Sequence, residues 1–139
     1  MKLHNHIVVS TIISGVSQYI FNSWQMSITV FLSGIFIDLD HLLDYFIYEK
    51  KIELDLKDFF YKCGTLTLEK EPLILHSYEL ITVLAIVSYF INNYIIVGLL
   101  LGLGTHIVFD IFTNKVYFLG YSFIFRLIHK FNYRKVFYG

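Results

Sequence analysis

The most constraining feature of this sequence is an uncharged stretch at its start, because residues 3–37 contain no Asp, Glu, Lys or Arg. One crossing of a lipid bilayer takes about 20 residues, so this stretch is too long for one helix and suits two short ones. Asn22 and Ser23 lie near its middle and predict a turn. We therefore expect one membrane helix over Ile7–Phe21 and a second over Gln25–Ile37. A cleavable signal peptide is the alternative, but no small-residue cleavage motif follows the apolar run.

The composition of the whole chain also favours a membrane protein. Hydrophobic residues make up 56% of the sequence and charged residues 16%, whereas soluble domains carry about 25% charged residues. The formal net charge is zero, which gives no basic field for binding nucleic acid. The single cysteine, Cys63, excludes an internal disulfide and a Cys-rich zinc site. Any metal site in this chain must therefore use His and carboxylate ligands.

A second pair of apolar segments follows a charged connection. Residues 44–71 are rich in Asp, Glu and Lys, so they predict an aqueous connection between the two pairs. Proline suits the first position of a helix, and we expect a third helix over Pro72–Ile91. A turn at Asn92–Asn93 leads to a fourth helix over Tyr94–Phe112. The sequence thus predicts a single all-α domain, residues 1–139, built as a polytopic membrane bundle of about four transmembrane helices.

The positive residues predict how this bundle lies in the membrane. All eleven Lys and Arg precede the first helix, lie in the connection or follow the fourth helix, and the two turns hold none. Cytoplasmic flanks of membrane helices are enriched in Lys and Arg. We expect a multi-pass protein of the inner or plasma membrane, with membrane lipid as its partner and both termini cytoplasmic. The aromatic and basic residues 115–139 predict an amphipathic tail on the membrane surface.

Histidines and aspartates gather at the predicted cytoplasmic ends of all four helices. An up-down-up-down path brings these ends into one layer, and helix bundles build internal metal sites in this way. The member from the first helix is His6, with His4 as its alternative. The candidate metal ligands are His6, Asp38, Asp40, His41, His76, His106 and Asp110.

The spacing of these residues supports a shared centre. His106 and Asp110 are four residues apart and share a helix face, and Asp38 and His41 are three apart and do likewise. An Asp at the centre of a membrane helix costs roughly 2.5–3.5 kcal/mol, so several of them need compensation. One or two divalent ions would supply it, and carboxylate with imidazole suits zinc, manganese or iron, with zinc as our first choice. The alternative is that these side chains reach the membrane interface separately.

Two carboxylates are candidate catalytic residues, because a spare carboxylate near a metal-bound water can accept its proton. Asp40 lies about 200° from Asp38 on a continuous helix, so it is free to act as this base, to bridge a second metal or to orient a ligating His. Glu79 is the other candidate base, and an ion pair with Lys70 is its alternative role.

Three short motifs together resemble the YdjM-like family of membrane-bound metal-dependent hydrolases, also described as LexA-regulated inner-membrane hydrolases. The His-x-x-x-Asp pair is also similar to that of zinc-dependent phospholipases C. The resemblance implies hydrolysis of a phosphate ester or lipid. The main alternative is a non-catalytic membrane protein with a structural metal, in which four protein ligands leave no position for a water. A small transporter is another alternative. The motifs are Gly34-Ile35-Phe36-Ile37-Asp38-Leu39-Asp40-His41, Leu75-His76-Ser77 and Gly104-Thr105-His106-Ile107-Val108-Phe109-Asp110.

Overall fold

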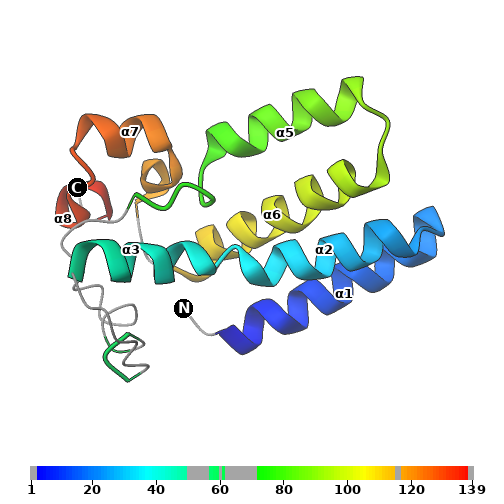
Figure 1. Ribbon diagram of the computed structural model, residues 1–139, viewed down its shortest axis with the longest axis horizontal. Helices are drawn as coiled ribbons and strands as arrows, with labels where there is room; N and C mark the ends of the chain where they lie inside the picture. The colour runs from blue at the N-terminus through cyan, green and yellow to red at the C-terminus, as the bar shows by residue number, and fades with distance from the viewer. Residues whose placement is uncertain (1–2, 50–56, 60, 62–71, 115–116, 138–139) are drawn as a thin grey trace.

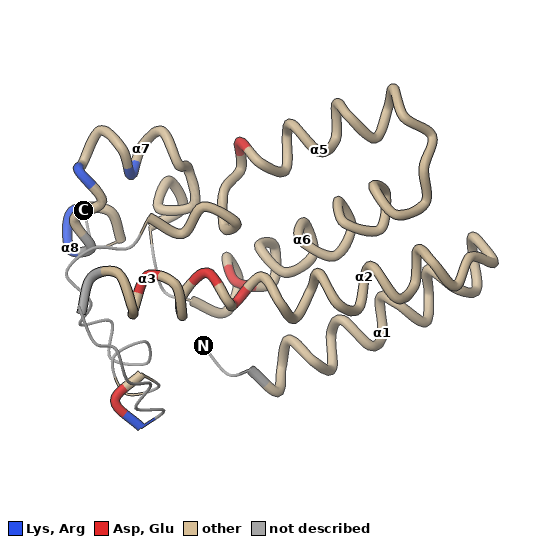
Figure 2. The backbone as a smooth tube through the Cα atoms, in the orientation of Figure 1, with Lys and Arg blue, Asp and Glu red and all other residues tan. Residues whose placement is uncertain are grey.

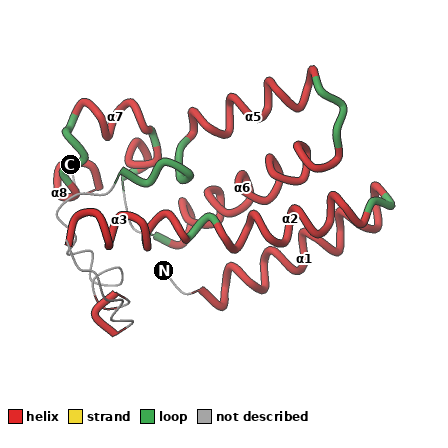
Figure 3. Tube along the Cα trace, viewed as in Figure 1, coloured by secondary structure: helices red, strands yellow, loops and turns green. Residues whose placement is uncertain are grey.

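Two helical hairpins form the body of the chain in the computed structural model (Figure 1). The described part is helical, as the sequence predicts, with loops between the helices (Figure 3). The first hairpin joins α1 (Leu3–Phe21) to α2 (Trp24–Phe36), and the second joins α5 (Tyr78–Phe90) to α6 (Tyr94–Thr113). The structure describes residues 3–49, 57–59, 61, 72–114 and 117–137.

Polar residues at the turns start the helices. Ser23 accepts a hydrogen bond from the backbone N–H of Met26 and caps α2, and the Asn93 side chain accepts one from the N–H of Ile95 and caps α6. Ser and Asn suit this position because their side chains satisfy N–H groups that the first turn leaves free. The two turns predicted from the sequence are therefore confirmed.

Helices α2 and α6 pack closely because small residues face each other between them. Cβ atoms added at Gly98 and Gly102 would lie 2.9 Å from the carbonyl oxygen of Met26 and 2.7 Å from that of Val30. Residues without side chains let helix backbones approach, as they do between membrane helices. This approach fixes how far the polar end of α6 lies from α2.

The second apolar segment breaks after α2 and continues as α3 (Leu39–Glu49). At the break the N–H groups of Asp38 and Asp40 donate to carbonyls three residues earlier, those of Ile35 and Ile37. Because α3 runs on to Glu49, the first residues of the predicted aqueous connection are helical. The rest of the predicted connection lies mostly outside the described residues.

The third helix begins six residues later than predicted from the sequence, at Tyr78 instead of Pro72. We call residues 72–77 the ligand segment. Its backbone leaves the helical path at Leu73, where φ is 44°, and the N–H of Leu73 donates to the Asp44 carboxylate of α3 at 3.1 Å. Ser77 then caps α5 by accepting from the N–H of Leu80.

The C-terminal residues, predicted as an amphipathic tail, fold into short elements that contact the ligand segment. They form a 3-10 turn, η1 (Phe118–Tyr121), and the short helices α7 (Phe123–Ile128) and α8 (Tyr133–Phe137). We call residues 117–137 the tail unit. Arg126 of α7 is fully buried. A guanidinium that leaves water needs a partner, and the ligand segment supplies one, the carbonyl of His76.

Two stretches of the described chain are long and apolar enough to cross a membrane. Trp24–Ile47 has 24 residues with a mean hydropathy of 1.5, and Tyr94–Thr113 has 20 with a mean hydropathy of 2.1. Figure 2 shows that the Lys, Arg, Asp and Glu residues of the described chain lie toward one end of the long helices, and that the two hairpin turns at the other end carry none. This arrangement confirms the predicted separation of charged and uncharged ends.

Candidate metal centre

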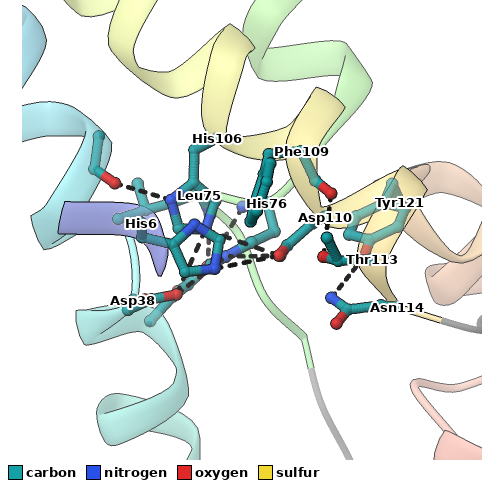
Figure 4. A network of polar contacts seen from close by, with 12 residues as sticks. His6, Asp38, Leu75, His76, His106, Phe109, Asp110, Thr113, Asn114 and Tyr121 are labelled. Atoms are coloured by element: carbon teal, nitrogen blue, oxygen red, sulfur yellow. Dashed lines mark hydrogen bonds and ion pairs between the residues drawn. The ribbon is translucent and has the colours of Figure 1, made fainter. Parts of the chain in front are cut away.

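Four segments distant in sequence bring imidazoles and carboxylates to one buried place (Figure 4). α1 contributes from its first turns, the break between α2 and α3 from its two sides, the ligand segment from its end, and α6 from its last turns. The residues that come together are His6, Asp38, Asp40, His76, His106 and Asp110.

The ring of His106 is oriented by the backbone of α2. Its Nδ1 lies 2.7 Å from the carbonyl oxygen of Gly34, and a carbonyl only accepts, so Nδ1 donates its hydrogen there. In the neutral ring the other nitrogen, Nε2, then carries a lone pair. That Nε2 lies 3.3 Å from Asp38 Oδ1 and 3.6 Å from Asp110 Oδ2, so three electron-rich atoms face one another.

The ring of His76 is held in the same manner by a carboxylate. Its Nδ1 lies 3.5 Å from Asp40 Oδ2, and its Nε2 lies 3.6 Å from Asp38 Oδ1 and 4.0 Å from Asp110 Oδ2. Burial disfavours the protonated ring, but the Asp38 and Asp40 carboxylates outweigh burial and raise the pKa of His76. The environment of this ring therefore favours a positive charge, whether a proton or a metal ion.

His6 completes the cluster from α1. Its Nε2 lies 3.3 Å from Asp110 Oδ1, and its ring stacks on that of His106 with centroids 3.9 Å apart. Phe109 packs edge-on against the His6 ring, with centroids 5.3 Å apart. The structure buries His6 and exposes His4, so His6 is the N-terminal residue that it brings to the cluster.

The spacing of these atoms fits a transition-metal ion. Ligands about 2.0–2.1 Å from a tetrahedral zinc lie about 3.3 Å from one another, close to the shorter separations here. Two overlapping groups, which share His106, have ligand atoms within 4.8 Å of one another: His6 with His106 and Asp110, and Asp38 with His76 and His106. Asp38 Oδ1 and the Nε2 atoms of His76 and His106 are buried without a hydrogen-bond partner. Buried His and Asp groups are thus placed to hold a metal ion.

Asp40 lies behind the cluster instead of facing its centre. Its Oδ2 accepts from the N–H of Leu75 at 2.6 Å and lies 3.5 Å from His76 Nδ1. A carboxylate on the far nitrogen of a ligating His fixes the tautomer and the orientation of the ring. This position suits the orienting role that the sequence left open for Asp40. His41 lies beside the cluster, with its ring centroid 5.0 Å from that of His76.

Glu79, the other candidate base, is not brought into the cluster. Its carboxylate accepts from the Ser122 hydroxyl at 2.6 Å and from the N–H groups of Phe123 and Ile124 at 2.8 Å and 3.1 Å. It therefore occupies the N-terminus of α7, where a negative charge is favoured. The alternative partner, Lys70, lies outside the described residues.

Sequence reasoning missed three groups that support the centre. The Gly34 carbonyl is a backbone atom and left no signal beyond its motif. Asp44 follows Asp40 by four residues, and that spacing on one helix face was a signal that both carboxylates serve one neighbour. Arg126 was read as part of a basic surface, although a single Arg among aromatic residues also fits a buried anchor.

Comparisons of the chain with protein-family models, with curated proteins and with solved structures gave no match in any of the three. The family resemblance of the three motifs therefore remains a prediction.

Proposed function

We propose that this chain is a membrane-bound metal-dependent hydrolase whose centre is the His and Asp cluster. The observation that supports this most directly is the meeting of His76 Nε2, His106 Nε2 and two carboxylates around one buried point, with the far nitrogen of each ring held by an acceptor. Such an arrangement prepares lone pairs for a cation. Zinc is our first choice, because imidazole and carboxylate ligands suit it and its bond lengths match the shorter separations between the ligand atoms.

The residues of the chain divide into holding and orienting roles. His76, His106, Asp38 and Asp110 would hold the ion, with His6 as a further ligand. A bound zinc ion supplies a water of lowered pKa and polarises the scissile group. Asp40 orients His76 and keeps its Nε2 toward the centre. The Asp38 side chain is 14% exposed, whereas those of His76, His106 and Asp110 are 2% exposed or less, so water and substrate would enter beside Asp38.

We place the chain in the membrane as four crossings, α1, α2 with α3, α5 and α6, with both termini cytoplasmic. The Lys and Arg residues of the described chain lie toward one end of the long helices. This supports the orientation, because cytoplasmic flanks are enriched in Lys and Arg. The centre then lies at the cytoplasmic interface, where an amphiphilic phosphate ester has its headgroup. A lipid phosphodiester is therefore the substrate class that we propose.

Metal analysis together with hydrolysis tests this function. The purified full chain in detergent should contain about one or two zinc ions per chain and should hydrolyse bis(p-nitrophenyl) phosphate, a generic phosphodiester. Removal of metal with a chelator should stop hydrolysis and zinc should restore it. Asp110→Asn should lose metal and hydrolysis together, while Asp58→Asn, outside the cluster, should retain both. A wild-type protein without divalent metal would end the proposal.

A structural zinc is the second candidate, and the burial of the ligand atoms favours it. Asp38 Oδ1, His76 Nε2 and His106 Nε2 are all shielded from solvent, and a structural site is closed by four protein ligands. Cobalt in place of zinc discriminates the two, because an open site binds added azide and changes its visible absorption, whereas a closed site does not.

A further inference from the structure

The tail unit contacts the ligand segment directly. Arg126 Nη2 donates to the carbonyl oxygen of His76 itself at 2.9 Å. Arg126 is fully buried, and its guanidinium also acts electrostatically on Asp44 of α3. A buried charge of this kind is expensive unless its geometry is satisfied, so Arg126 constrains the position of the His76 backbone.

Further contacts lie on both sides of His76, at Leu73 of the ligand segment and in the first turn of α5. The Tyr78 hydroxyl donates to the carbonyl of Phe118 at 3.0 Å, and Leu73 packs with Val136 and Phe137 in a buried cluster. The Glu79 carboxylate accepts two backbone N–H groups of α7. The tail unit thus touches the chain on each side of His76.

The ligand segment needs this support because it is not a helix. Its N–H groups at Leu75 and His76 bond to Asp40 of α3, and that of Leu73 bonds to Asp44 of the same helix. A side chain on a non-helical segment shifts with its backbone, and a displacement of about 0.5 Å already spoils a metal site. The backbone of His106, by contrast, is held within helix α6.

We propose that Arg126, through its hydrogen bond to the His76 carbonyl, is a positioning residue that holds His76 at the metal centre. The tail unit then supports the metal site, although the two ligand groups of the described chain contain none of its residues. This inference rests on the proposed metal centre and adds a role for the C-terminal residues.

The test is a double-mutant cycle on zinc affinity in the full chain, measured by competition with a chromophoric chelator. Arg126→Gln removes the charge and shortens the donor, and Arg134→Gln on the exposed face of α8 is the matched control. We expect Arg126→Gln to weaken zinc binding about 10–100-fold, the usual cost of losing an outer partner of a ligand. Arg134→Gln should leave the affinity unchanged, and Arg126→Lys should recover part of it.

The background of the substitution distinguishes positioning from general stability. If Arg126 acts through His76, Arg126→Gln costs nothing further in a His76→Ala chain, which retains four ligand residues, and costs the full factor in a His6→Ala chain. An equal loss in both backgrounds overturns the proposal. If His76→Ala binds zinc too weakly to titrate, X-ray absorption of zinc-loaded Arg126→Gln decides: one imidazole ligand fewer supports the proposal, and an unchanged number overturns it.

A second variant covers a failure of Arg126→Gln to fold, which circular dichroism would reveal. Tyr78→Phe removes the bond to Phe118 and should give a smaller loss that also disappears in the His76→Ala chain; a loss that persists there overturns the proposal. An absence of zinc from the wild-type chain would instead defeat the proposed function, so the two failures are distinguishable.

Discussion

His106 on α6 and Gly34 on α2 are joined by a contact of 2.7 Å between the ring Nδ1 and the backbone carbonyl oxygen. The contact lies where the two most extensively packed helices of the described chain meet. Since the carbonyl occupies Nδ1, the orientation of Nε2 toward Asp38 follows from how α2 and α6 pack. The candidate metal centre and the helix interface are therefore one structural unit.

Loss of the His106 ring should abolish metal binding. His106→Ala removes the residue that the two ligand groups of the described chain share, so we expect zinc content near zero by elemental analysis. His129→Ala is the control, because His129 caps the end of α7, where its Nδ1 contacts the carbonyl of Phe125 at 2.9 Å, and it lies outside the cluster. Full zinc content in His106→Ala would contradict the ligand assignment.

Asp40→Asn should weaken zinc binding without abolishing it. The amide retains an acceptor for the N–H of Leu75 but no longer bears the charge near His76 Nδ1, and loss of such an outer partner costs about 10–100-fold in affinity. Asp44→Asn is the comparison, because Asp44 bonds to the N–H of Leu73, and it should change affinity less. Unchanged zinc affinity with hydrolysis reduced about 10²–10⁴-fold would show instead that Asp40 is the base.

The sequence was informative about the fold where side-chain chemistry alone decides structure. The uncharged residues 3–37 and the asparagines at the turns marked the two hairpins. Apolar runs long enough to cross a bilayer and capping residues can be read from neighbouring residues of the sequence alone. The start of α5 was misplaced by six residues, because the Pro72 signal competes with carboxylates of α3 that lie far away in sequence. The folded tail was missed for the same reason, since its anchor, Arg126, bonds to the distant His76.

Substitution of Gly102 should destabilise the chain, whereas substitution of Gly104 should not. A Cβ at Gly102 would clash with the Ser33 hydroxyl and lie 2.7 Å from the Val30 carbonyl, while one at Gly104 meets nothing within 4 Å. Overpacking of this kind costs on the order of 1–3 kcal/mol, and Ala at an open helix position gains up to about 1 kcal/mol over Gly. Thermal unfolding in detergent should show a lower midpoint for Gly102→Ala and an equal or higher one for Gly104→Ala.

The stabilisation produced by zinc should increase with pH. The raised pKa of His76 means that its protonated ring stabilises the metal-free chain below the ordinary value of about 6.5, and that this contribution is lost as pH rises through the raised pKa. Zinc needs the neutral ring, so protons compete with it at low pH. The difference in unfolding midpoint with and without zinc should therefore grow between about pH 6 and pH 8, and a constant difference would show that His76 is no ligand.

Reporter fusions should place the two uncharged turns outside the cytoplasm. Fusions at Asn22 and Asn92 lie at the ends that hold no Lys or Arg, whereas fusions at Asp58 and after Gly139 lie on the positive side. We expect the first two to be active only with periplasmic or external reporters and the others only with cytoplasmic ones. A reversal at any of the four positions would refute the four-crossing topology.

The members of the site were predictable as residue types, but their separate roles were not. His76 and His106 look alike in the sequence, yet one is oriented by a carboxylate and the other by a backbone carbonyl. Glu79 and Asp40 were both candidate bases with open alternatives, and only the packing of the tail unit directs Glu79 to Ser122. Roles depend on neighbours that the chain brings together only after it has folded.

The contact of His6 with Asp110 joins the first helix of the chain to the last long one, and it has a consequence for biogenesis. In the four-crossing arrangement that we propose, a nascent chain with only α1, α2 and α3 inserted would contain His6 and His41 but neither His76 nor His106, the imidazoles that face Asp38 in the folded chain. Contacts between residues so distant along the chain form late in folding. On the proposed function, metal uptake would therefore follow the arrival of α6, because both ligand groups of the described chain include His106.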